Sequence, residues 1–324
     1  MRYDIGIDLG GTNIVVGLVD DGGRIAGKVS KPTDAGREPK HVIRDMAELV
    51  ALAAERSGVS MDAVGSVGVG VPGLANSETG VVGFASNLYW HAVPLARLLS
   101  DAVGKPAYIG NDANAAAYGE YVAGAAKSNG SCVAITLGTG IGGGMVNEGR
   151  IFTGFNFAGM EIGHMVIRRG GRPCPCGRLG CWERYASATG LIITTRERME
   201  ENRRSKLWEL VEGDLDRVEG RTAFDGLRAD DETAKIIVET YLDELACGVI
   251  NLINVLQPDI LCVGGGISNE GDILIVPLRA RVMKEVYSRD SDRNTRIVQA
   301  KLGNDAGIIG AAHLYKVQKE ETKA

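Results

Sequence analysis

Apolar residues alternate with small or polar ones from the start of the chain. Residues 3–19 predict a strand, a tight turn at Gly10-Gly11 and a second strand, which together make a β-hairpin. Over residues 42–54 the apolar positions recur at helical spacing, and residues 64–71 form an apolar strand. Alternating strands and helices predict an α/β fold with a largely internal sheet.

The hairpin pattern occurs a second time. A shift of 128 positions places residues 135–140 (Ile-Thr-Leu-Gly-Thr-Gly) on residues 7–12 (Ile-Asp-Leu-Gly-Gly-Thr). This short match suggests two similar α/β halves with a cleft between them. We expect a small domain over residues 1–116, with a C-terminal helix at about 306–324 packing back on it, and a large domain over 117–305.

The rest of the chain continues the alternation. The predicted elements are an alanine-rich helix (113–126), a charged and solvated helical excursion (197–232), a helix (234–256), a buried strand leading into a glycine turn (258–266), a strand (297–302) and a closing helix (306–317).

Composition narrows the class of protein. The 324 residues are 44% hydrophobic and 24% charged, which is typical of a globular protein. The net charge of −5 argues against a general nucleic-acid binder, because such a protein needs a basic face. The apolar stretches fall short of the ~20 residues that span a bilayer, and the first residues lack the apolar region of a signal peptide. We therefore expect a cytoplasmic protein.

Glycine-rich turns are the first candidates for chemistry. Residues 68–73 and 138–143 both fit the pattern G-x-G-x-x-G, but neither leads into the helix that a dinucleotide fingerprint requires. The sequence also contains no Walker A motif. One glycine turn alone is most simply an ordinary hairpin. Two matching turns and the run Gly264–Gly266 favour phosphate binding by backbone N–H groups.

Three cysteines and a histidine lie close together in the sequence. His164 precedes Cys174, Cys176 and Cys181, and three thiolates with one imidazole would complete a tetrahedral zinc site. A disulfide, which a reducing compartment disfavours, and free thiols are the alternatives. The isolated Cys132, Cys247 and Cys262 are predicted to be buried as small apolar residues.

These motifs together resemble those of the ROK family (repressors, open reading frames, kinases) over essentially the whole chain. The matching stretches are Asp8–Asn13, Leu137–Gly144 and Gly264–Gly266, and residues 174–183 fit the family's Cys-x-Cys-Gly-x-x-Gly-Cys-x-Glu signature without departure. The resemblance implies a two-domain actin/hexokinase-like (ribonuclease H-like) fold and ATP-dependent phosphorylation of a hexose, with glucose as the expected acceptor.

The resemblance also implies roles for individual residues. Asp112 is the expected catalytic base, although its place after a strand and at the start of a helix is equally that of a cap or first-turn residue. The expected sugar ligands are Gly73, Asn87, Asn111, Asp112, Glu161, His164 and Glu183. The expected nucleotide ligands are Asp8, Gly10, Gly11, Thr12, Asn13, Gly138, Thr139, Gly140, Gly265 and Gly266. Structural Zn²⁺ would be held by His164, Cys174, Cys176 and Cys181, and Mg²⁺ would lie near Asp8, bound mainly by phosphates and water.

Several alternatives stay open. An N-acetylmannosamine kinase or another hexose kinase would share these motifs, and polyphosphate or ADP could replace ATP as donor. A sugar-responsive repressor of the same family would carry a winged helix before the first hairpin, for which Tyr3 leaves no room. A zinc module for nucleic acid is disfavoured by the acidic charge. The resemblance further implies a homo-oligomer, either a dimer or a tetramer.

Overall fold

A computed structural model describes residues 2–321 of the chain, and the side chains of residues 2–318. The chain divides into two compact units. The first unit contains Met1–Ala134, Gly144–Met160 and Ala300–Ala324, and the second unit contains Ile135–Gly143 and Glu161–Gln299. The domain bounds predicted from the sequence stay a prediction. Residues 322–324 of the predicted closing helix lie outside the described residues.

The first unit contains a five-stranded sheet of order β3-β2-β1-β4-β8. Strand β1 is antiparallel to β2 and parallel to β4, and β4 is parallel to β8. A separate sheet has the order β5-β6-β7. The strands are β1 (Tyr3–Leu9), β2 (Asn13–Asp20), β3 (Ile25–Pro32), β4 (Val64–Val71), β5 (Leu74–Asn76), β6 (Val81–Ala85), β7 (Trp90–Val93) and β8 (Ala107–Asn111). The helices are α1 (Pro39–Arg56), α2 (Leu95–Val103), α3 (Asp112–Val122), α10 (Ala306–Ala312) and α11 (Leu314–Glu321).

A second five-stranded sheet has the order β11-β10-β9-β12-β13. Its strands are β9 (Ser131–Leu137), β10 (Ile141–Asn147), β11 (Arg150–Ile151), β12 (Ile260–Gly264) and β13 (Arg296–Gln299). The 128-position shift carries β1 onto the bounds of β9, and the two sheets have the same succession of strands. The prediction of a repeated architecture is therefore confirmed at the level of strand order.

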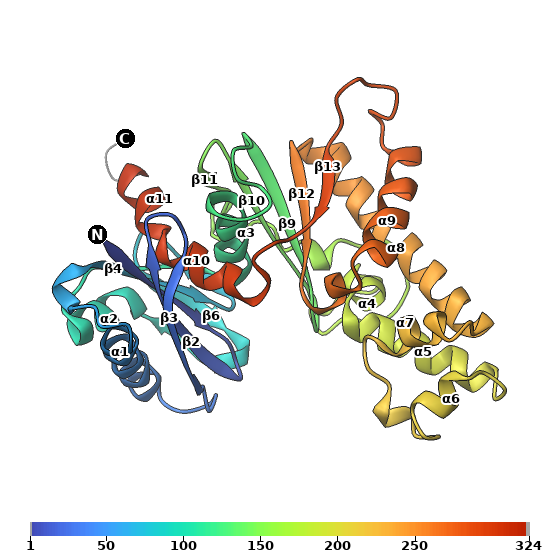
Figure 1. The fold of residues 1–324 in the computed structure, drawn as a ribbon, viewed down its shortest axis with the longest axis horizontal. Helices are drawn as coiled ribbons and strands as arrows, with labels where there is room; N and C mark the ends of the chain where they lie inside the picture. Colours follow the sequence, from blue (N-terminus) through green and yellow to red (C-terminus); the bar gives the residue numbers. More distant parts are fainter. Residues whose placement is uncertain (1, 322–324) are drawn as a thin grey trace. The chain divides into compact units, whose positions relative to one another are not determined.

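The two faces of the first sheet are covered differently. Apolar side chains such as Ile5 and Ile7 pack with α1, whereas α10 and α3 lie on the opposite face (Figure 1). Glycines on that opposite face allow the helix to approach the strands closely. A β-carbon added at Gly6 would lie 1.8 Å from the Ile308 oxygen, and one added at Gly68 would lie 1.8 Å from the Ala311 oxygen. Helix α10 consequently packs backbone to backbone on β1 and β4.

The second unit is mainly helical outside its strands. Helix α8 (Glu232–Leu256) packs against α4 (Glu183–Ala186), α5 (Ala188–Glu201), α7 (Thr222–Arg228) and α9 (Asp272–Glu285). A short helix, α6 (Leu207–Leu210), lies within the charged segment. That segment is helical as predicted, but it is not solvated throughout, because Leu207 and Phe224 are completely buried. Over the described residues no helix has the length and apolar character needed to cross a bilayer.

Some boundaries differ from the predictions. Helix α3 ends at Val122, because the buried carboxylate of Glu120 accepts the N–H of Ala125 and closes the chain into a turn. The closing helix is interrupted at His313, and β13 ends at Gln299. Cys247 is only partly buried, whereas Cys132 and Cys262 are buried as expected.

Substituting Gly68 by alanine should destabilise the fold. The added methyl group would collide with the Ala311 carbonyl, which belongs to a packed helix backbone and has little freedom to move. Overpacking of this kind typically costs about 1–3 kcal/mol of unfolding free energy, measured by urea denaturation. Gly22→Ala in an exposed turn is the control. Equal stability of the two variants would contradict the close-approach explanation.

Candidate functional site

Asp112 lies where β8 ends and α3 begins. The preceding residue, Asn111, caps the helix, because its Oδ1 accepts the N–H groups of Ala113 at 2.9 Å and Asn114 at 3.1 Å. Asp112 is therefore a first-turn residue, as predicted, with its own Oδ1 2.8 Å from the Ala113 nitrogen. Burial raises the pKa of Asp112 above its usual value, while the hydrogen bonds from Ala113 partly oppose that rise.

Gly73 and Asn111 are joined directly. The Asn111 side-chain nitrogen donates to the Gly73 oxygen at 3.2 Å. Gly73 has a φ of +90°, and an added β-carbon would lie 2.2 Å from the Phe84 oxygen, so only glycine fits this position. The turn after β4 is therefore fixed to the start of the helix that carries Asp112.

Asp8, at the end of β1, is the electrostatic neighbour of Asp112. Burial, together with the charge of Asp112, raises the pKa of Asp8 to about 6. The Asp8 side chain also lies against the first turn of α10, because a β-carbon on Gly307 would be 3.4 Å from its carboxyl carbon. Two partly buried carboxyl groups with raised pKa values thus share one end of the first sheet, an arrangement typical of functional sites.

The predicted phosphate turn follows Asp8 immediately. Gly10 donates its N–H to the Asn13 oxygen at 2.9 Å, which closes the turn between β1 and β2. A cavity of about 730 Å³ is lined by residues of this turn, by Asp8 and by the basic residues Lys28 and Arg56. Asn87 is close as well, because a β-carbon on Gly11 would lie 3.3 Å from the Asn87 β-carbon. The first unit therefore gathers Asp8, Asp112, the turn and Asn87.

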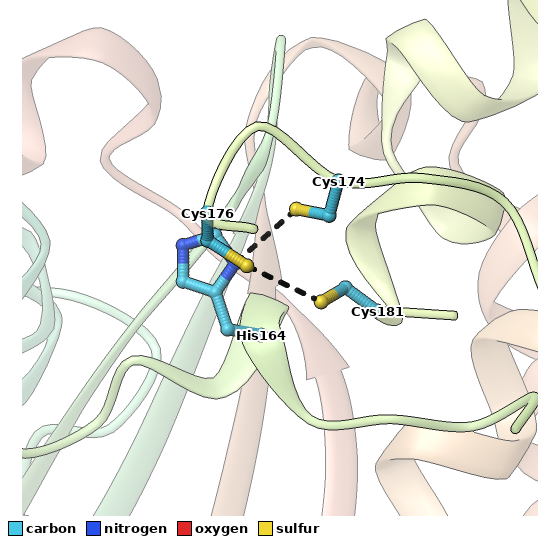
Figure 2. A group of neighbouring side chains, drawn as sticks. All are labelled: His164, Cys174, Cys176 and Cys181. Carbon is cyan, nitrogen blue, oxygen red and sulfur yellow. Dashed lines mark hydrogen bonds between the residues drawn. The ribbon is translucent and has the colours of Figure 1, made fainter. Parts of the chain in front are cut away.

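The second unit holds the cysteine cluster. One ligand atom from each of His164, Cys174, Cys176 and Cys181 lies within 4.8 Å of the others. Figure 2 shows the four side chains converging, with His164 Nδ1 3.6 Å from Cys174 Sγ and Cys176 Sγ 3.6 Å from Cys181 Sγ. Tetrahedral zinc with Zn–S bonds of about 2.3 Å separates its sulfur ligands by about 3.8 Å. The donor set and its spacing therefore fit zinc.

Backbone and aromatic contacts brace the loop that carries the cluster. The Cys174 nitrogen donates to the Arg178 oxygen at 2.9 Å, and Arg178 in turn donates from its side chain to the His164 oxygen at 2.9 Å. Trp182 is completely buried, and its indole nitrogen donates to the Glu244 oxygen on α8. Burial raises the pKa of the Cys174 thiol, and a bound cation would favour its thiolate form.

Glu183 connects the cluster to the second glycine turn. Its Oε1 accepts from Cys174 Sγ at 3.2 Å and lies 3.7 Å from His164 Nδ1. A β-carbon on Gly140 would be 2.6 Å from Glu183 Oε2, and the Gly138 oxygen accepts the N–H of Ala188. Gly265 packs on the end of β9, because its β-carbon would lie 2.5 Å from the Leu137 nitrogen.

The expected sugar ligands are divided between the two units. Gly73, Asn87, Asn111 and Asp112 belong to the first unit, and Glu161, His164 and Glu183 belong to the second. Glu161 is exposed and precedes the short 3-10 helix that carries His164. Sequence reasoning missed the Gly307 contact to Asp8 and the Trp182 anchor, since a lone glycine or tryptophan carries no recognisable motif.

Comparisons with known proteins show which family the chain belongs to. The model of the ROK family matches residues 4–318. The glucokinase of Thermotoga maritima is 39% identical over 314 residues, or 96% of each chain, and that of Streptomyces coelicolor is 34% identical over 98% of each chain. A crystal structure of a ROK family glucokinase from Streptomyces griseus with glucose and AMPPNP is similar with a TM-score of 0.82 and 32% identity, covering 96% of this chain and 98% of that one.

Replacing Asp8 by asparagine should change how stability depends on pH. Burial and the charge of Asp112 raise the pKa of the Asp8 carboxyl from its ordinary value of 3.8 to about 6 in the folded chain, so the folded state binds the proton more tightly than the unfolded state does. This group therefore destabilises the fold above about pH 6, and the penalty disappears as the pH falls towards 4.

We expect Asp8→Asn to melt at a higher temperature than the wild type at pH 7.5, with a difference that shrinks at pH 5. Calorimetry at several pH values measures this, and the exposed Asp21→Asn is the control. A constant difference across the pH range would contradict the raised pKa.

Replacing Cys176 by alanine should remove bound zinc. Cys176 is the exposed member of the cluster, so its loss leaves the core packing intact while removing one of four ligands. Metal analysis of the purified protein measures the zinc content, and Cys247→Ala, outside the cluster, is the matched control. We expect zinc near one per chain in the control and well below that in Cys176→Ala. Equal zinc in both would exclude Cys176 as a ligand.

Proposed function

Because this chain belongs to the ROK family, we propose that it is an ATP-dependent hexose kinase that transfers the γ-phosphoryl group of ATP to the 6-hydroxyl of glucose. The observation that carries the chemistry is the placement of Asp112 at a helix start, beside Asp8 and the phosphate turn. Family membership and the full-length similarity to glucokinases support the choice of ATP and glucose.

Asp112 is the general base of the proposed reaction. Its carboxylate accepts the proton of the sugar hydroxyl as that oxygen bonds to the γ-phosphorus, and the bond from phosphorus to the bridging oxygen breaks to release ADP. Burial raises the pKa of Asp112, and a carboxylate with a higher pKa is a stronger base for accepting the hydroxyl proton. General-base assistance contributes about 10²- to 10⁴-fold, and most of the remaining acceleration comes from positioning and charge neutralisation.

The two glycine turns hold the donor in this proposal. Backbone N–H groups of Gly11–Asn13 and of Thr139–Gly140 bind phosphate oxygens. The N–H groups of Gly10 and Gly138 close the two turns instead, by donating to the Asn13 and Gly140 oxygens, and Gly265 and Gly266 complete the nucleotide site. Mg²⁺, bound through phosphates and water near Asp8, would neutralise charge on the transferred group. Positive charge from the metal would favour the ionised form of Asp8, whose pKa burial raises to about 6.

The metal cluster has an orienting role. Zinc held by His164 and the three cysteines would fix the loop that carries Glu183, which already contacts His164 and Cys174. Glu161, His164 and Glu183 then present polar groups to sugar hydroxyls, together with Asn87 and Asn111. A site that hydrogen-bonds several hydroxyls rejects sugars that leave its polar groups unpaired.

Asp112→Asn should abolish phosphorylation while leaving glucose binding measurable. The amide preserves the shape of the side chain and accepts the Ala113 N–H, but it is a far weaker base. We expect kcat to fall by at least about 100-fold, followed by coupled ADP release, with the glucose Kd from calorimetry within a few-fold of the wild type.

Asp101→Asn on the exposed face of α2 is the control and should keep wild-type turnover. Near-normal turnover of Asp112→Asn would refute the base assignment. Wild-type activity on N-acetylmannosamine, mannose or fructose without activity on glucose would instead refute the choice of acceptor.

A further inference from the structure

Thr33 forms two hydrogen bonds to the predicted phosphate turn at Gly10–Thr12. It follows β3 directly and is completely buried. Its hydroxyl Oγ1 donates to the Gly10 oxygen at 2.7 Å, and its backbone N–H donates to the Thr12 oxygen at 2.8 Å. A single residue outside the motif therefore donates hydrogen bonds to the carbonyl oxygens at both ends of the Gly10–Thr12 turn.

The direction of these two carbonyl groups matters for an anion. A carbonyl oxygen carries partial negative charge and repels phosphate, whereas the N–H groups of the same turn attract it. Because Gly10 and Gly11 have no side chains to restrict them, the peptide planes of this turn need an external restraint. The two hydrogen bonds to Thr33 supply that restraint, and a turn fixed before binding does not reorganise during the reaction.

Thr33 is itself held by an ion pair whose carboxylate, from Asp45, is buried. The Arg37 side chain donates to the Thr33 oxygen at 2.7 Å and to Asp45 Oδ2 at 2.7 Å. Asp45, on α1, is only 1% exposed and also accepts from Lys31 at 2.6 Å. Burial alone would raise the pKa of Asp45, but the hydrogen bonds and charges of Lys31 and Arg37 outweigh it and lower the pKa. The restraint on the turn thus extends from α1 through Arg37 to Thr33.

We propose that Thr33 is a positioning residue for the phosphoryl donor, acting through the carbonyl groups of Gly10 and Thr12, with Arg37 and Asp45 fixing Thr33 in turn. This inference rests on the proposed function, because it assigns the turn to the donor phosphates. It predicts that loss of the Thr33 hydroxyl weakens nucleotide binding selectively and leaves the sugar site unchanged.

Thr33→Val tests the hydroxyl while keeping the size and branching of the side chain. We expect the KM for ATP to rise by about 3- to 10-fold, the effect of one net hydrogen bond, and the Kd of Mg·ADP from titration calorimetry to rise in parallel. The KM for glucose should stay within two-fold. Thr33→Ser restores the hydroxyl and should return both nucleotide constants towards wild-type values.

The matched control is Thr295→Val in the second unit. Thr295 is 5% exposed, and its hydroxyl donates to the Pro258 oxygen at 2.7 Å, so its loss removes an equivalent buried hydrogen bond. We expect it to lower the melting temperature without a selective change in the nucleotide constants. If Thr33→Val shows no larger change in the KM for ATP and the Kd of Mg·ADP than Thr295→Val, the inference is wrong.

Two further measurements keep the outcome decisive. Should Thr33→Val fail to fold, Arg37→Met removes the support of Thr33 and should shift the nucleotide constants selectively in the same direction; unchanged constants would overturn the inference. Measurements on the wild type distinguish a failure of this inference from a failure of the proposed function. A wild type that binds Mg·ADP but phosphorylates no hexose would refute the proposed function, and Thr33→Val would still test the nucleotide turn.

Discussion

The close packing of helices α3 and α10 on a glycine-lined sheet is the constraint from which the candidate site follows. Gly6 and Gly68 leave no side chain between the strands and α10. The two helices approach each other just as closely, since a β-carbon on Gly310 would lie 1.7 Å from the Ala115 oxygen. Asp112 starts one of these helices, and Asp8 lies against the other. Ordinary side chains at these glycines would push the helices outward and separate the two carboxyl groups.

The two units contribute different kinds of chemistry. In the first unit, burial raises the pKa values of Asp8 and Asp112, and the charge of Asp112 raises that of Asp8 further, beside a backbone turn suited to anions. In the second unit, three thiols and an imidazole converge on one loop, and Glu183 connects that loop to a second glycine turn. The paired carboxyl groups and the cysteine cluster thus belong to separate units of the chain, and each is braced by local contacts.

Local sequence patterns predict the elements and clusters whose residues lie close together in the sequence. The first hairpin, the strand at 64–71, the cysteine cluster and the place of Asp112 at a helix start could all be predicted from the sequence, because short spacings fix them. The interruption of the closing helix at His313 could not be predicted, because the apolar pattern continues on both sides of that residue. The contacts of Thr33 could not be predicted either, because its hydrogen bonds go to Thr12 and Gly10, which lie 21 and 23 positions earlier in the sequence. No run of residues encodes a contact over such a distance, and only the folded chain reveals it.

The repeated hairpin carries different side chains at one equivalent position. Under the 128-position shift, Asp8 in β1 corresponds to Thr136 in β9, although the two strands have equivalent bounds and places in their sheets. The same backbone pattern therefore presents a carboxyl group in one sheet and a neutral hydroxyl in the other. One side chain is enough to give two otherwise equivalent strand ends a different charge.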